Sequence, residues 1–198
     1  MLLRSIAAVA SAAVLGACSQ APTPEVSTNA VGEWQTLFDG SSLSGWSLVG
    51  DANWRLTDGA VEADSGTGFL LTAATYADFD LTLEFFVSPD ANSGVFIRCA
   101  NPSEIGAATC YEVNIFDQRP DPTYRTGAIV NVAEPKVTIE TGDRWSSYEI
   151  SARGQRLVVK LNGQTTVDAT DDKLAAGPIA LQYGAGRVMF RNVRIRTN

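Results

Sequence analysis

The chain contains no histidine, and this absence excludes several kinds of catalytic site at once. Without histidine there can be no Ser–His or Cys–His nucleophile pair, and no metal site that depends on imidazole. A basic surface is also lacking, because the formal net charge is −7, the sequence pI is near 4.6 and the arginines form no run. Nucleic acid is therefore not an expected partner.

Helix-like periodicity is missing as well. No long segment repeats its apolar residues every 3.6 positions, and short alternating runs are instead separated by turn residues roughly every eight to twelve positions. Asp58-Gly59 and Asn162-Gly163 are typical of tight hairpins, and a change of apolar phase predicts a bulge near Asn192. With 45% hydrophobic residues, we expect one all-β domain built as a two-sheet antiparallel jelly-roll sandwich.

Cysteine is scarce, and the first of the three cysteines belongs to a targeting segment. Residues 1–18 have Arg4 at a positive start, a short apolar run from Ile6 to Leu15, and Cys18 after small residues. The segment resembles a bacterial lipoprotein signal, which predicts Cys18 as a lipidated anchor to the membrane in the cell envelope, facing the periplasm or in the outer membrane. A plain secretory peptide is the alternative, and either one predicts export.

The other two cysteines lie in the part of the chain expected to fold. Residues 19–32 are small, polar and proline-bearing, which indicates a flexible tether and leaves residues 33–198 as the domain. Within that domain, Cys99 and Cys110 bracket a short loop. In an oxidising compartment we predict that they form a disulfide, and two free thiols are the alternative.

Three segments in the middle of the chain place charged or amide side chains on the same strand face as aromatic ones. The side chains concerned are Glu84 and Phe86 in the first segment, Phe96 and Arg98 in the second, and Glu112, Asn114 and Phe116 in the third. If these faces share one side of a sheet, they form a surface that suits a sugar. The alternative is that they are ordinary solvated strand faces with a Glu84–Arg98 ion pair.

A series of motifs covers most of the mature domain, from Trp34 to Arg196. It includes Trp34-Gln35-Thr36-Leu37-Phe38-Asp39-Gly40, Asn92-Ser93-Gly94-Val95-Phe96-Ile97-Arg98, Tyr111-Glu112-Val113 and Gly177-Pro178-Ile179-Ala180-Leu181-Gln182. In number and order these motifs resemble the 3-keto-disaccharide hydrolase family, also described as 3-keto-glucoside 1,2-lyases and 3-keto-2-hydroxyglucal hydratases. The resemblance implies a concanavalin A-like, glucanase-type jelly roll in an exported protein that acts on sugars oxidised at C3. The chain departs from the family at Tyr183, where members commonly carry histidine, and at Asn114, where they carry glutamine.

A ketone at C3 acidifies the proton on C2, so a carboxylate base can start cleavage by β-elimination, and hydration of the resulting enone completes a net hydrolysis. In this scheme we expect Glu112 to be the base or a metal ligand and Glu84 its carboxylate partner. Arg98 is expected to bind the enolate or a hydroxyl, Asn114 to orient the sugar, and the three phenylalanines to frame it. The two carboxylates together could instead hold a divalent cation through oxygen ligands.

Two other classes of protein stay open. A carbohydrate-binding module of the same fold would bind without chemistry and could stack sugars on Trp46, Trp54, Trp145 or Tyr183. A structural surface lipoprotein would have its concave face covered by protein. An ordinary glycosidase fits less well, because the Glu-x-Asp-x-x-Glu strand usual in glucanase-type jelly rolls does not occur in the sequence.

Overall fold

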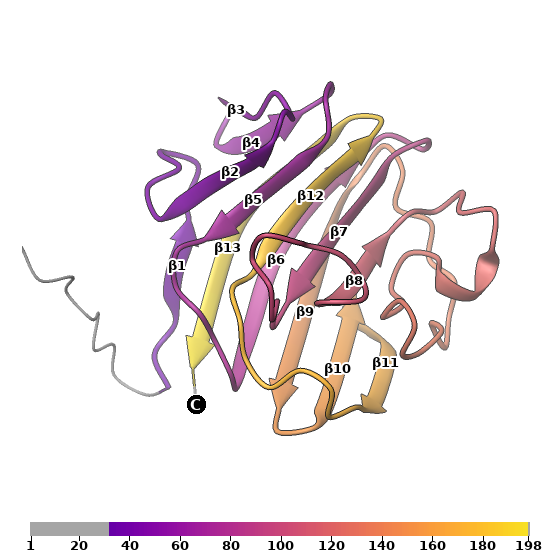
Figure 1. The fold of residues 1–198 in the computed structure, drawn as a ribbon. Coiled ribbons are helices and arrows are strands. Elements are labelled where there is room, and N and C mark those ends of the chain that lie inside the picture. Colours follow the sequence, from indigo (N-terminus) through magenta and orange to yellow (C-terminus); the bar gives the residue numbers. More distant parts are fainter. Residues whose placement is uncertain (1–31, 198) are drawn as a thin grey trace, which may run out of the picture.

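The computed structural model describes residues 32–197, which form two antiparallel β-sheets packed face to face (Figure 1). The predicted jelly-roll sandwich is confirmed. The predicted targeting segment, most of the tether and the proposed anchor Cys18 lie outside the described residues. Across residues 32–197, the single helical element is the 3₁₀ turn η1 (Pro122–Tyr124), and no helix is long and apolar enough to cross a membrane.

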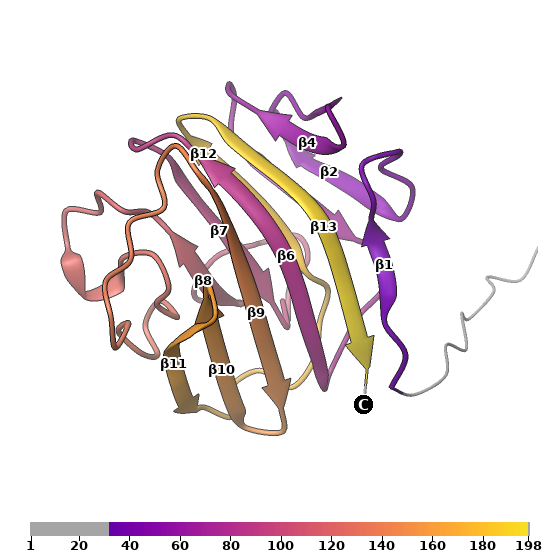
Figure 2. The ribbon, with the colours of Figure 1, turned by 180° about the vertical axis from the view of Figure 1, so that it is seen from behind.

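Sheet A is the larger of the two sheets. Its eight strands are β1 (Gln35–Phe38), β3 (Arg55–Thr57), β4 (Ala60–Ala63), β6 (Phe79–Val87), β9 (Trp145–Arg153), β10 (Arg156–Leu161), β11 (Gln164–Thr170) and β13 (Val188–Thr197). They are ordered β11-β10-β9-β6-β13-β4-β3, and β1 pairs with the later part of β13. Figure 2 shows this sheet in front, with β13 between β6 and β1.

Sheet B has five strands in the order β2-β5-β12-β7-β8. The strands are β2 (Trp46–Gly50), β5 (Gly68–Thr72), β7 (Asn92–Ile97), β8 (Tyr111–Ile115) and β12 (Ala180–Ala185). Their partners along the sheet are far apart in sequence, since β12 lies between β5 and β7. Sheet B therefore brings the early, middle and late parts of the chain together on one surface.

The turn chemistry read from the sequence is confirmed. Asp58 and Gly59 have φ values of 48° and 75° between β3 and β4, and Asn162 and Gly163 have 49° and 78° between β10 and β11. Two consecutive residues with positive φ match the right-handed twist of hairpin strands. The predicted bulge is also present, because Asn192 has a φ of 53° where the register of β13 on β6 shifts.

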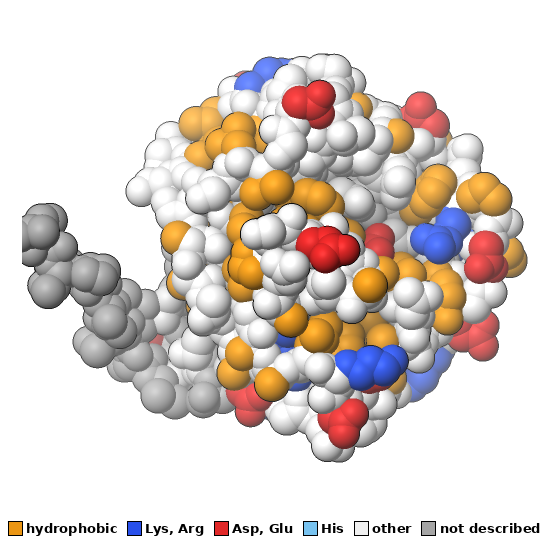
Figure 3. Space-filling view, viewed as in Figure 1, with side chains coloured by type: hydrophobic (Ala, Val, Ile, Leu, Met, Phe, Trp, Pro, Cys, Tyr) orange, Lys and Arg blue, Asp and Glu red, His pale blue; other side chains and the backbone are white. Residues whose placement is uncertain are grey.

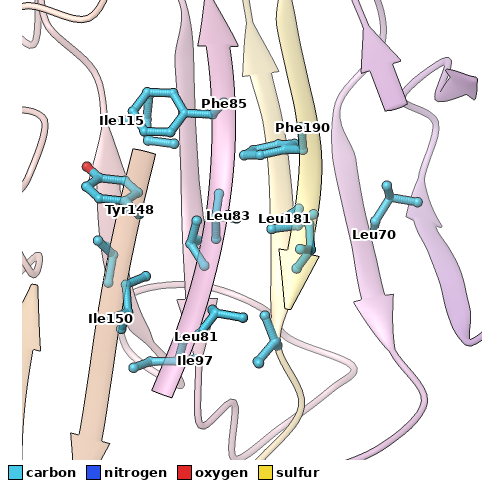
Figure 4. Packing of buried hydrophobic residues seen from close by; sticks show 14 of the residues in the cluster. Leu70, Leu81, Leu83, Phe85, Ile97, Ile115, Tyr148, Ile150, Leu181 and Phe190 are labelled. Atoms are coloured by element: carbon cyan, nitrogen blue, oxygen red, sulfur yellow. The ribbon is translucent and has the colours of Figure 1, made fainter. Parts of the chain in front are cut away.

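The core lies between the two sheets and is built by alternation along each strand. On β6, Leu81, Leu83 and Phe85 point inward and are at most 2% exposed. Figure 4 shows side chains from strands of both sheets meeting in this layer. Tyr148 is also buried there, and its hydroxyl donates to the Asn114 carbonyl and accepts from the Gly127 N–H. The core thus occupies the inward side of every long strand and leaves the outward sides for other roles.

The predicted disulfide between Cys99 and Cys110 is confirmed. It closes the loop between β7 and β8, which Figure 1 shows in front of sheet B. Both cysteines are buried in a small cluster with Phe96 and Ala180, against which Ile105 of the loop packs. The bond therefore holds a flap of chain on the outward side of sheet B.

Candidate functional site

The three polar-aromatic faces predicted to share a surface are divided between the two sheets. β6 belongs to sheet A, whereas β7 and β8 belong to sheet B. The core separates the sheets, so Glu84 and Glu112 point outward on opposite surfaces of the sandwich. The prediction of one common surface is wrong for β6, because the turn at residues 88–91 carries the chain from one sheet to the other. It does not fold β7 back beside β6.

On the outward side of sheet A, Glu84 is held in a local ion pair. Its carboxylate accepts hydrogen bonds from Arg191 Nε at 2.7 Å and Asn192 Nδ2 at 2.9 Å. Burial disfavours ionisation, but these two donors outweigh burial and lower the pKa of Glu84. Phe86 lies on the same side and packs against Trp145, with ring centroids 5.9 Å apart. Glu84 cannot partner Glu112 in catalysis or share a metal ion with it.

Arg98 is a structural residue in this fold, not a ligand-binding one on an open face. Its side chain is buried, and its guanidinium donates to the carbonyls of Ala77, Gly154 and Leu174 and to the carboxylate of Asp78. Alternation along β7 predicts that Arg98 points to the same side as Phe96. Its φ of +51° instead takes the backbone out of the strand conformation. The side chain therefore turns away from that face and ties loop segments together.

The two remaining phenylalanines of the predicted frame have different surroundings. Phe96 lies on the outward side of sheet B but is 1% exposed, because the disulfide loop covers it, and it meets Phe69 edge to face at 5.3 Å. Phe116 follows β8 and is half-buried, with its backbone N–H bonded to Thr126 Oγ1. Phe96 therefore lies under the disulfide loop on the outward side of sheet B. Phe116 lies at the edge of that side.

Glu112 and Asn114 do lie together on the outward side of sheet B, as predicted. The register across the sheet pairs Gly94 with Asn114 and with Gln182, so these three form one row across β8, β7 and β12. Glu112 lies in the next row, opposite Phe96. Sequence reasoning missed Gln182 and Gly94, although alternation along residues 180–185 is a signal that places Gln182 opposite the inward-facing Leu181.

A long loop, residues 116–144, forms one wall of this face. Asp117 anchors it, because its buried carboxylate accepts from Thr126 Oγ1 and from the backbone N–H groups of Thr141 and Gly142. The loop also extends the sheet, since the Val130 N–H donates to the Glu112 carbonyl. Figure 3 shows a hollow in this side of the molecule, with hydrophobic side chains around it and charged atoms of both signs nearby.

Glu112 has the electrostatics of a proton-transfer group. Burial withdraws its carboxylate from water and raises its pKa to about 7, while the charge of Arg119 in the wall loop acts in the opposite direction. Across the five sheet B strands that the structure describes, Glu112 is the only charged side chain. A carboxyl group that is close to half-protonated near neutral pH can both take and return a proton.

Two amide oxygens beside Glu112 have no protein partner. Asn114 Oδ1 and Gln182 Oε1 are buried and accept no hydrogen bond from any residue between 32 and 197. The amide of Asn114 is nevertheless oriented, because its Nδ2 donates to the Tyr124 carbonyl in the wall loop. Buried acceptors without donors are costly, so this row is suited to a ligand that brings donors.

The four aromatic residues considered for sugar stacking do not lie on this face. Trp46 and Tyr183 are buried in the core, and Trp54 packs against Tyr183 at a centroid distance of 6.4 Å. Trp145 lies on the outward side of sheet A beneath Arg191, whose guanidinium carbon is 3.8 Å from the ring centroid. A stacking platform built from these residues is therefore not available on sheet B.

Metal ligation has no ready cluster in the described part of the chain. No group of three or more Asp, Glu or Cys side chains within residues 32–197 is arranged to hold a metal ion. The predicted pair of Glu84 and Glu112 is also split between the two surfaces.

Comparison with known proteins agrees with the fold. Levanase of Bacillus subtilis (strain 168) is 25% identical over 165 residues, which cover 81% of this chain and 24% of the levanase, so the chain spans about a quarter of that relative. Two solved structures from Parabacteroides distasonis ATCC 8503, each described as a putative glycosyl hydrolase, have TM-scores of 0.75 and 0.71 at 18% and 24% identity. Each covers 84% of this chain, which covers 94% and 100% of them respectively.

A carbohydrate-binding module of Bacillus subtilis, CBM66, aligns with a TM-score of 0.61 at 20% identity, over 76% of this chain and 94% of the module. At these identities the solved structures establish the jelly-roll fold alone. The family match is more specific, because residues 33–196 fit the model of the 3-keto-alpha-glucoside-1,2-lyase-like domain. The chain therefore belongs to this family of carbohydrate-active, glycosidase-like or sugar-binding proteins.

Proposed function

We propose that the outward side of sheet B binds a 3-keto-glycoside and that Glu112 acts there as the base that removes the C2 proton. The observation that carries this proposal is the isolation of Glu112. It is the only charged group in the strands of sheet B, and burial raises its pKa to about 7. Membership of the 3-keto-alpha-glucoside-1,2-lyase-like family supports the substrate class.

The reaction balances with one residue moving one proton. Glu112 accepts the C2 proton, the electrons of the C2–H bond form the C1–C2 double bond, and the C1–O bond breaks to release the aglycone oxygen, which takes up a proton. Water then adds to C1 of the enone while a proton returns to C2, which gives net hydrolysis. Arg119, whose charge already acts on Glu112, takes the enolate-stabilising role that Arg98 cannot fill.

The proposal is tested with Glu112→Gln, which keeps the shape of the side chain but removes its basicity. With a 3-keto-glucoside as substrate and enone absorbance as the readout, we expect kcat to fall by about 10²- to 10⁴-fold, the usual contribution of a general base. The matched control is Glu84→Gln, the same change on the opposite surface, which should keep the wild-type rate. An undiminished rate in Glu112→Gln would refute the assignment.

Sugar binding without chemistry is the second candidate. It is favoured by the same isolation of Glu112, because no second acid in the sheet B strands stands ready to protonate the leaving oxygen. In that case an unoxidised glucoside should bind the chain in calorimetry, and no enone should form from the 3-keto sugar. Export with an anchor at Cys18 is part of the proposal too, and the Cys99–Cys110 bond supports an oxidising compartment.

A further inference from the structure

The row formed by Gln182, Gly94 and Asn114 has two amides with a glycine between them. Neighbouring strands lie about 4.8 Å apart, so the two amides project from backbones separated by roughly two strand spacings. The glycine adds no side chain of its own to the interval between them. An ideal Cβ placed on Gly94 would lie 3.2 Å from Phe96 Cε2 and 3.5 Å from Gln182 Oε1, so both side chains reach the glycine.

Gly94 is not required by the backbone. Its φ lies outside the left-handed region, and its neighbours on β8 and β12 pair in regular register around it. A glycine in an ordinary strand conformation weakens the strand, and it commonly marks a place where another group approaches the backbone closely. On this outward face, the groups that approach Gly94 are the Phe96 ring and Gln182 Oε1, and a ligand on the two amides would lie next to them.

The row carries two buried hydrogen-bond acceptors without donors in the described part of the chain, beside the Gln182 amide nitrogen, which can itself donate. Asn114 Oδ1 is fixed in its direction by the bond from Nδ2 to Tyr124, and neither it nor Gln182 Oε1 has a donor among residues 32–197. A ligand ketone or carboxylate would leave these oxygens unsatisfied, whereas hydroxyl groups would satisfy them. The adjacent row holds Phe96 and Ala180, which the disulfide loop covers.

We propose that Gly94, Asn114 and Gln182 form a floor that recognises two hydroxyl donors on one edge of the sugar ring. This inference rests on the proposed function, because it takes the sugar to lie in the hollow beside Glu112. It also sets the orientation of the substrate. The hydroxyl-bearing edge lies over Gly94, and the C3 ketone, an acceptor, points away from the amide oxygens. The three residues are specificity residues, and Glu112 remains the group that touches the reacting C2 proton.

The test measures affinity rather than turnover. Glu112→Gln in the full chain serves as the background, so that the probe stays intact. The probes are methyl 3-keto-α-glucoside and its 2-deoxy, 4-deoxy and 6-deoxy analogues, each titrated by calorimetry. Gln182→Met removes the acceptor at similar length, and Gly94→Ala adds one methyl to the floor without straining the backbone. Gln164→Met is the matched control, because Gln164 is an exposed glutamine of β11 in sheet A, on the opposite side of the sandwich.

We expect at least one deoxy analogue to bind the background protein about 10-fold more weakly than the parent sugar, since leaving a buried acceptor unpaired costs about 1.4 kcal/mol or more. Gln182→Met should weaken the parent by a similar factor and abolish the discrimination against that analogue. Gly94→Ala should weaken the parent about 10-fold, and Gln164→Met should leave its affinity unchanged.

The outcomes separate this inference from the proposed function. If wild-type protein forms the enone through Glu112 but the deoxy analogues and the Gly94 and Gln182 variants bind like the parent sugar, the inference is overturned and the function stands. If the variants lose affinity as expected but wild-type protein forms no enone, the floor stands and the chain is a binder. Absence of binding by every probe would overturn both.

Discussion

Burial of Glu112 raises its pKa to about 7, and the pH dependence of activity follows from that shift. A base must be ionised, so kcat/KM for a 3-keto-glucoside should rise about tenfold per pH unit below pH 7 and level off above it. A pH–rate profile of the wild-type protein measures this. A flat profile between pH 5 and 8 would show that Glu112 does not act as the base.

The same shift makes a stability prediction with the opposite sign. The folded pKa lies above the ordinary glutamate value of 4.5, so the folded state holds the proton more tightly. The stabilisation is fully present below about pH 4.5 and is lost as the pH rises through about 7. At 1.36 kcal/mol per pKa unit the difference is at most about 3 kcal/mol. Urea unfolding should therefore find Glu112→Gln more stable than wild type at pH 8 and equal to it at pH 4.

Arg98 carries a prediction about structure instead of catalysis. Arg98→Ala leaves Asp78 and the carbonyls of Ala77, Gly154 and Leu174 without their donor, so we expect the free energy of unfolding to fall by about 3–5 kcal/mol. Arg98→Lys should recover little of this, because an ammonium cannot reach acceptors in so many directions. Enone formation per folded molecule should be unchanged, and a selective loss of turnover would restore the ligand-binding role.

The wrong prediction for Arg98 shows where reasoning from strand alternation fails. Alternation correctly placed Glu112 and Asn114 on one face, since both lie inside a regular strand. Arg98 lies one residue past the end of β7, and a positive φ is uncommon for arginine. The residues next to Arg98 in the sequence do not indicate that conformation. Asn192 did indicate the bulge, because it is an amide residue at the position where the apolar alternation shifts.

At the scale of elements, the loop between Cys99 and Cys110 can be made less constrained by removing its disulfide. Replacing Cys99 and Cys110 together by alanine should lower the free energy of unfolding by about 3 kcal/mol, on the chain-entropy estimate for a loop of this length. The loop covers Phe96, so the KM for a 3-keto-glucoside should rise as well. Urea unfolding and steady-state kinetics measure the two effects. An unchanged KM in a destabilised variant would separate the loop from the site.

The division of β6 and β7 between sheets was not predictable from the strand pattern. Residues 88–91 have the composition of a tight turn, which fits a hairpin within one sheet as well as a crossing between two. The alternation along a strand predicts which of its residues face the core. It does not predict to which of the two sheets the strand belongs. The same ambiguity hid Gln182, which reaches its neighbours Gly94 and Asn114 only through the pairing of β12 with β7.

At the scale of the whole molecule, charge is distributed unevenly between the two outer surfaces. Sheet A carries cross-strand ion pairs such as Arg196–Asp80, Arg191–Glu84 and Arg156–Asp168. The strands of sheet B carry Glu112 alone. The strands of sheet A thus carry many paired charges. The strands of sheet B carry a single acid among neutral side chains. The overall fold and the sugar-related family were foreseeable from motif order, but this contrast depends on which strands share a sheet.

The position of β13 in sheet A has a consequence for how the chain is made. It follows every other strand in sequence, yet it pairs with β6 on one side and with β4 and β1 on the other. During synthesis the ribosome releases β1, β4 and β6 first, and the strand that joins them emerges last. Until β13 emerges, β6 on one side and β4 and β1 on the other have no strand between them. Assembly of sheet A must therefore wait for β13, and pairing between strands so distant in sequence is usually slow. The nascent chain therefore cannot complete sheet A until its final strand arrives.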